Sequence, residues 1–119
     1  MTGFPDLLAE AQAGASRFGH REHVRLSWLA VTRHGPAAAI ELIGAGLGAV
    51  APGRYHVTMT RAWVEIVARH VGDDPDFDAF VARCPDLLDK HLLDRHYRPA
   101  TLAAPAARTG WVPPDRRPW

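Results

Sequence analysis

Cysteine is nearly absent from this sequence, since Cys84 is the only one among 119 residues. An intramolecular disulfide is therefore impossible, and no thiolate cluster is available to bind zinc or an iron–sulfur centre. The first residues also lack the basic segment and the apolar run of a secretory signal peptide. These absences favour a cytoplasmic protein.

The sequence also has little excess charge, with 14 basic residues, 13 acidic residues and a formal net charge of +1. A protein this close to neutrality has no broad electrostatic field to attract nucleic acid or an anionic membrane. Its longest apolar stretch, residues 37–50, contains Glu41 and is too short to span a bilayer. Phosphate-binding loops, dinucleotide-binding fingerprints and nucleophile-elbow motifs are absent as well. We therefore expect neither a nucleic-acid nor a membrane partner, and we interpret Arg116 and Arg117 as part of a tail.

What the sequence does contain is helical periodicity with clear boundary residues. Hydrophobic residues make up 47% of the chain, enough for the core of a single domain over residues 1–119. Apolar residues recur at three- and four-residue steps, and Pro or Gly stands at most ends of the periodic segments. The spacing predicts helices over residues 5–13, 20–34, 36–50, 55–70, 77–83 and 85–92. The fold class is predicted to be all-α, a compact bundle of about four to six helices, with an irregular, proline-rich tail over residues 98–119 that wraps the surface.

The chain has seven histidines, more than its length would lead one to expect, and three of them occupy related places. His20 and His23 lie at the start of the second predicted helix, and His56 lies at the start of the fourth. Short connections make consecutive helices antiparallel, so the second and fourth helices run parallel, with their N-termini at one end of the bundle. A helix of about 15 residues is roughly 22 Å long, which keeps the histidines at the far helix ends away from this group. We therefore expect these three side chains to converge.

Two histidines three residues apart lie on one face of a helix and can chelate a transition metal. A third imidazole from a neighbouring helix would leave one coordination position open for water or substrate, as in catalytic metal sites. The sequence therefore predicts a metal site with His20, His23 and His56 as ligands and Cu, Fe or Zn as the metal, and haem held by one axial histidine is an alternative. Neutral imidazoles at helix N-termini are equally suited to capping or to core packing, so a structural role stays open.

Two strings of the sequence carry a resemblance. Residues 18–29, FGHREHVRLSWL, resemble the F-x-H-x-x-H-x-x-L-x-W signature of an uncharacterised family of small bacterial helical proteins. Residues 55–60, YHVTMT, resemble the Y-H-x-T-x-T segment of that family, and shorter similarities extend the match over most of the chain from Phe18 onward. The resemblance names no activity. Position by position, it implies functional roles for His20, His23, His56, Thr58, Thr60 and Tyr97.

Three functional hypotheses follow from these observations. The first is a small-molecule enzyme with a His-ligated metal, redox or hydrolytic, in which Tyr97 or His96 closes the site. Thr58 and Thr60 would then orient the ring of His56 or bind substrate. The second is metal-free acid–base catalysis by the same histidines, since imidazole side chains titrate near neutral pH. The third is a non-catalytic binding or regulatory module in which the histidines are structural and the Gly/Ala-rich third helix offers a face for a homo-oligomer.

Overall fold

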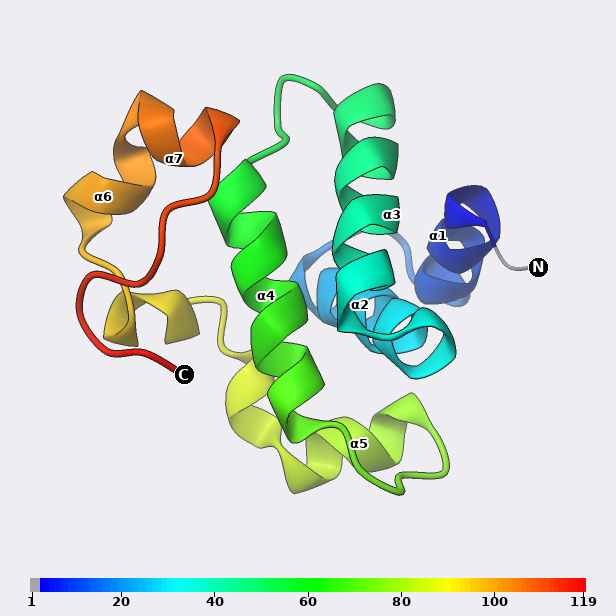
Figure 1. Ribbon diagram of the computed structural model, residues 1–119. Helices are drawn as coiled ribbons and strands as arrows, with labels where there is room; N and C mark the ends of the chain where they lie inside the picture. Colours follow the sequence, from blue (N-terminus) through cyan, green and yellow to red (C-terminus); the bar gives the residue numbers. More distant parts are fainter. Residues whose placement is uncertain (1–2) are drawn as a thin grey trace.

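The structure, a computed structural model, describes residues 3–119 and is all-α over that range, as predicted (Figure 1). Within residues 3–119 no helix is long and apolar enough to cross a membrane. Three of the predicted helices have the predicted bounds, but the single helix predicted over residues 85–92 is wrong, since two short 3₁₀ helices stand in its place. The elements in chain order are α1 (Phe4–Gln12), α2 (His20–His34), α3 (Pro36–Val50), α4 (Val57–His70), α5 (Phe77–Arg83), the 3₁₀ helices η1 (Pro85–Leu88) and η2 (Leu92–Arg95), α6 (Pro99–Ala103) and α7 (Pro105–Thr109).

Glycine and proline set the boundaries of α2 and α3. α2 begins after Gly19, whose N–H donates a hydrogen bond to Oε1 of Glu22 at 2.9 Å. Between the two helices, Gly35 has a φ of 84°, a conformation that favours glycine because L side chains rarely adopt it. Pro36 follows at the first turn of α3, where its missing N–H has no intrahelical partner to lose. The chain therefore turns sharply from α2 into α3.

The helices pack around α2, α3 and α4, each of which contacts the other two. α3 and α4 lie side by side and run in opposite directions, and α2 passes behind them (Figure 1). α1 packs against α2 and α3, whereas α7 packs against α4. α5 and η1 contact each other, and η1 also contacts α2. The starts of α2 and α4 are thereby connected to segments far away in the sequence.

The core consists of two clusters of buried side chains, and both α2 and α4 contribute to each. α4 gives Trp63 and Ile66 to a cluster that it shares with α5, η1, η2 and the buried Tyr97. It gives Val64 to a second cluster, formed mainly by α1, α2 and α3. Trp28 of α2 is partly buried and packs against both clusters. α2 and α4 are therefore the two helices that join the halves of the core.

The glycines of α3 permit close packing against its neighbours. The ring of Phe4 lies so close to Gly46 that a Cβ atom at this position would overlap it. At Gly44 a Cβ atom would lie 2.9 Å from the hydroxyl oxygen of Tyr55. Glycine inside a helix costs roughly 1 kcal/mol relative to alanine. The close contact with α1 and with the turn before α4 offsets this cost.

The C-terminal segment, residues 98–119, is more regular than predicted. It contains α6 and α7, each of which begins with a proline at its first turn. The hydroxyl of Thr58 donates a hydrogen bond to the carbonyl oxygen of Gly110 at 2.7 Å and accepts one from the N–H of Val112 at 3.0 Å. The hydroxyl of Tyr97 donates to the carbonyl oxygen of Val112 at 2.7 Å. Polar contacts from Thr58 of α4 and from Tyr97 therefore fix this segment in place.

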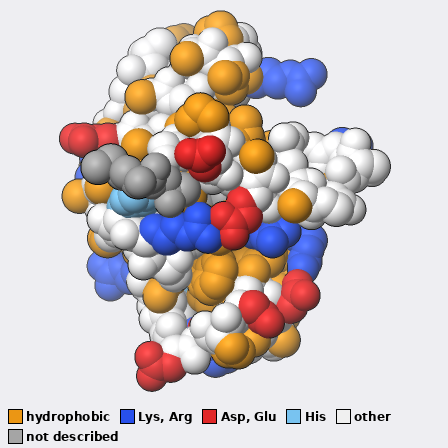
Figure 2. Space-filling model, turned by 90° about the vertical axis from the view of Figure 1, so that its right-hand side faces the viewer, with side chains coloured by type: hydrophobic (Ala, Val, Ile, Leu, Met, Phe, Trp, Pro, Cys, Tyr) orange, Lys and Arg blue, Asp and Glu red, His pale blue; other side chains and the backbone are white. Residues whose placement is uncertain are grey.

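The face formed by α1 and α3 is turned to the viewer in Figure 2. Hydrophobic side chains are spread over it, and a band of basic and acidic side chains crosses its middle. A shallow hollow of about 680 Å³ lies between the two helices. Its lining is mostly small or apolar, and includes Phe4, Ala38, Leu42, Ala45, Ala49 and Val50.

Candidate functional site

A pocket that opens between α1, α2, the end of α3 and the start of α4 receives three of the six predicted site residues: His23, His56 and Thr60. Its volume is about 450 Å³, within the range of roughly 300–1,000 Å³ that is usual for small-molecule sites. We call it the His23 pocket. It is lined by Leu8, Gln12, Phe18, His23, Leu47, Val50, Ala51, Arg54, Tyr55, His56, Met59 and Thr60.

His23 is the histidine of this pocket with unused hydrogen-bonding capacity. Its Nε2 atom is buried and has no hydrogen-bond partner among residues 3–119. Burial disfavours the charged imidazolium, and the nearby His20 adds repulsion, so the pKa of His23 falls to about 4. His23 is therefore neutral at neutral pH. A buried polar atom without a partner costs about 1–3 kcal/mol, a cost that a ligand with a matching polar group would remove.

His56 acts as the N-cap of α4. Its Nδ1 atom accepts a hydrogen bond from the N–H of Met59 at 3.1 Å. Its Nε2 atom lies 2.8 Å from the carbonyl oxygen of Leu102 and donates to it, since a carbonyl oxygen only accepts. Both ring nitrogens are thus used inside the protein. Because His56 has the extended backbone of a cap, α4 begins at Val57, two residues later than predicted.

His20 opens α2 but does not line the His23 pocket. Its Nε2 atom lies 2.9 Å from the carbonyl oxygen of Leu87 in η1 and donates a hydrogen bond to it. Its ring packs edge-on against Trp63 of α4, with 4.6 Å between the ring centroids. His20 therefore connects α2 to η1 and to the core of α4.

Of the three histidines that we expected to share a metal ion, His20 and His56 bond to different segments of the chain, and Nε2 of His23 has no partner among residues 3–119. Coordination through Nε2 of His20 or of His56 would break the bond of that atom to a carbonyl oxygen. In the part of the chain that the structure describes, no group of three or more His, Cys, Asp or Glu side chains is placed so that it could hold a metal ion. The metal site, with Cu, Fe or Zn or with haem as the cofactor, stays a prediction.

The remaining predicted site residues belong to the attachment of the C-terminal segment. Thr58 and Tyr97 hydrogen-bond to the backbone of residues 110–112. Tyr97 is fully buried, and burial raises the pKa of its phenol far above the usual range, so the hydroxyl stays a donor. The Nδ1 atom of His96 lies 2.6 Å from the carbonyl oxygen of Arg117. Neither Tyr97 nor His96 lines the His23 pocket.

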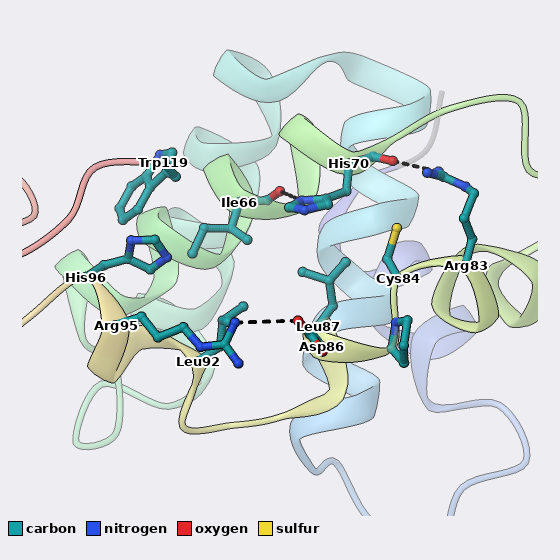
Figure 3. A pocket seen from close by; sticks show the side chains of 11 residues that line it. Ile66, His70, Arg83, Cys84, Asp86, Leu87, Leu92, Arg95, His96 and Trp119 are labelled. Carbon is teal, nitrogen blue, oxygen red and sulfur yellow. Dashed lines mark hydrogen bonds and ion pairs between the residues drawn. The ribbon is translucent and has the colours of Figure 1, made fainter.

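A second pocket, of about 530 Å³, lies between the end of α4, η1 and η2. Figure 3 shows His70 and Cys84 on one side of it and Arg95, His96 and Trp119 on the other. Its floor includes buried apolar side chains of α4 and of the 3₁₀ helices. The sequence patterns did not predict this pocket.

The charged groups of the second pocket are already paired. Arg83 contacts Asp74, with 2.7 Å between Nη2 and Oδ2, and Arg95 contacts Asp86, with 3.5 Å between Nη1 and Oδ2 (Figure 3 shows the latter). The Nδ1 atom of His70 lies 2.8 Å from the carbonyl oxygen of its own helix residue Ile66. These contacts occupy both arginines of the second pocket, and none of its side chains within residues 3–119 has a buried polar atom without a partner.

Sequence reasoning missed Arg54 and Tyr55 as pocket residues, although both precede the cap His56. The backbone N–H groups of Arg54 and Tyr55 both bond to the carbonyl oxygen of Ala51, at 3.0 and 2.9 Å, and so fix the turn. The Arg54 side chain is exposed and has no ion-pair partner among residues 3–119. One sequence signal could have indicated Arg54: it is a basic residue in the turn directly before a predicted helix.

Comparison of the chain with protein families, with curated proteins and with solved structures found no match. The resemblance to a small bacterial family therefore stays a prediction. The functional proposal therefore depends on the geometry of the His23 pocket.

Proposed function

We propose that this protein binds a small, largely apolar molecule in the His23 pocket and that neutral His23 makes the polar contact with it. The observation that carries the proposal is the buried, unpartnered Nε2 atom of a histidine that lines an apolar pocket of ligand size. Binding sites for small molecules typically combine apolar walls with a few polar groups that fix the orientation of the ligand. The His23 pocket has this composition.

Binding is favoured over acid–base catalysis by the pKa of His23. A general base works best when its pKa lies near the operating pH. A pKa of about 4 makes His23 a weak base at neutral pH but a good hydrogen-bonding group, because it stays uncharged. His56 has no ring nitrogen free to serve as the base in its place.

Binding is also favoured over a three-histidine metal site. Two of the three expected ligands donate Nε2–H to carbonyl oxygens of distant segments. Metal binding through these atoms would have to offset the loss of two partly buried hydrogen bonds, each worth about 1 kcal/mol net.

The proposal is tested with N-phenyl-1-naphthylamine, a neutral dye whose fluorescence rises in apolar surroundings and whose amine N–H can donate to an imidazole nitrogen. Untagged protein is titrated with the dye, and saturable binding is expected. Met59→Trp places a larger ring at the pocket, and Leu88→Trp is its matched control, since the two side chains are 37% and 38% exposed and only Met59 lines the pocket. Thermal midpoints of both variants report whether they fold.

We expect Met59→Trp to weaken dye binding and Leu88→Trp to leave it unchanged. His23→Phe, which keeps a flat ring but removes its nitrogens, should weaken binding about fivefold, the equivalent of one hydrogen bond. Absence of saturable binding, or equal binding by Met59→Trp and the wild type, would overturn the proposal.

A further inference from the structure

We infer that the ligand of the His23 pocket is a monoanion, with an apolar body in the pocket and a single carboxylate paired with Arg54. This inference rests on the proposed function and adds the charge and the chemical class of the ligand. It follows from the charges that line the pocket, from the bonding of Arg54 and from the shape of the turn that holds it.

The charges around the pocket are of one sign. Among residues 3–119, Arg54 is the only Lys or Arg that lines the pocket, and no Asp or Glu lines it. His23 is neutral at neutral pH, and His56 is committed to the backbone through both ring nitrogens. A ligand in this pocket therefore meets one positive charge without a compensating negative one.

Arg54 has no carboxylate partner among residues 3–119, which is also true of Arg69, but of these two only Arg54 lines the His23 pocket. Arg33, Arg61 and Arg83 each contact an acidic side chain at 2.6 to 2.7 Å. The guanidinium fork matches a carboxylate in two parallel hydrogen bonds, which favours a planar carboxylate over a neutral polar group. The partner that Arg54 lacks inside the protein is the group we assign to the ligand.

The backbone of the turn that carries Arg54 is held in place, so this side chain extends from a defined point beside the pocket. The backbone N–H groups of Arg54 and Tyr55 both donate to the carbonyl oxygen of Ala51. The ring of Tyr55 lies against the glycines of α3: a Cβ atom at Gly48 would lie 3.5 Å from it. Leu8, Phe18 and Leu47 supply apolar walls on the other sides. A compact ring system with one carboxylate at its edge suits this arrangement.

The test compares two competitors of the same shape, 1-naphthoate and 1-naphthamide, for their ability to displace N-phenyl-1-naphthylamine. In the wild type we expect the carboxylate to bind about fivefold more tightly than the amide, the upper end of the contribution of an exposed ion pair. Arg54→Gln should abolish this preference. Arg69→Gln removes the same charge from the exposed end of α4, outside the pocket, and should preserve it.

The outcomes separate this inference from the proposed function. If the dye binds and both competitors displace it equally well from the wild type, the carboxylate inference is overturned and the binding pocket stands. If the preference persists in Arg54→Gln, another cation is responsible and the inference is again overturned. If the wild type shows no saturable dye binding, the proposed function is overturned and the inference with it.

Discussion

The Nε2 atom of His56 lies 2.8 Å from the carbonyl oxygen of Leu102, which is 46 residues further along the chain. The other ring nitrogen of His56 caps α4 through the N–H of Met59. One side chain thus orders the first turn of α4 and attaches α6 to it. It also fixes one edge of the His23 pocket.

The two bonds of His56 can be separated by substitution. His56→Ala removes both the cap and the bond to Leu102, and we expect it to lower the free energy of unfolding by about 2–3 kcal/mol. His56→Asn keeps a side-chain acceptor for the cap but is too short to reach Leu102, so its cost should be about 1 kcal/mol. Urea denaturation measures both values. Equal stability of the two variants would show that the cap contributes nothing.

The low pKa of His23 predicts a pH dependence of stability. The pKa lies at about 4 in the folded protein and near the ordinary value of 6.5 in the unfolded chain, so between these values the unfolded state binds more protons. The contribution of neutral His23 to the free energy of unfolding is therefore fully present above about pH 6.5 and decreases as the pH falls toward 4. From pH 7 to pH 5 the loss should be about 2 kcal/mol. His23→Phe should remove this part of the pH dependence, and an unchanged slope in that variant would contradict the assignment.

The attachment of the C-terminal segment predicts unequal costs for two conservative substitutions. Thr58→Val removes one hydrogen bond donated to Gly110 and one accepted from Val112, whereas Tyr97→Phe removes only the bond donated to Val112. At about 1 kcal/mol per bond, Thr58→Val should cost roughly 2 kcal/mol and Tyr97→Phe roughly 1 kcal/mol. Thermal or urea unfolding measures the difference. The reverse order would mean that the hydroxyl of Thr58 is not a principal anchor.

The glycines of α3 are predicted to respond oppositely to alanine. Gly46→Ala places a Cβ atom inside the contact with Phe4 and should destabilise the protein by about 1–3 kcal/mol. At Gly48 a Cβ atom would lie 3.5 Å from the nearest atom of Tyr55, an ordinary contact. Gly48→Ala should therefore gain up to about 1 kcal/mol in helix propensity. If both variants were stabilised, α1 would not pack against α3 as closely as described.

Metal binding has a direct test of its own. Because His20 and His56 donate to carbonyl oxygens, added Zn²⁺ should raise the thermal midpoint of the wild type no more than that of His20→Gln. Untagged protein is required, since a polyhistidine tag would bind the ion itself. A rise seen in the wild type and lost alike in His20→Gln, His23→Phe and His56→Asn would establish the three-histidine site instead.

Local signals in the sequence were sufficient to predict the all-α fold and most helix boundaries. Gly19, Gly35 and Pro36 bound α2 and α3 at the residues expected, because caps and turns depend on near neighbours in the chain. The prolines of residues 98–119 predict an irregular tail, but Pro99 and Pro105 each open a short helix. Proline fits both contexts, so composition alone could not distinguish them.

The candidate site was only partly predictable for a different reason. His23 and His56 line one pocket, in keeping with the expectation that the starts of α2 and α4 lie near each other. The bonding partners of His20 and His56 are 67 and 46 residues away, so no local pattern could reveal that these nitrogens are occupied. Arg54 is an exposed basic residue in a turn, like others in the sequence. Only its position beside the pocket, which the fold reveals, distinguishes it from them.

The position of α4 in both core clusters has a further consequence for how the molecule opens. Neither cluster can separate without exposing apolar residues of α4, so the two halves of the core should come apart in one cooperative event. Amide protons in the middle of α4 would then exchange with solvent only when the whole molecule unfolds. The ends of α1 and the short helices α6 and α7 would exchange through smaller, local openings, and the His23 pocket lies where the slow and the fast parts of the chain meet.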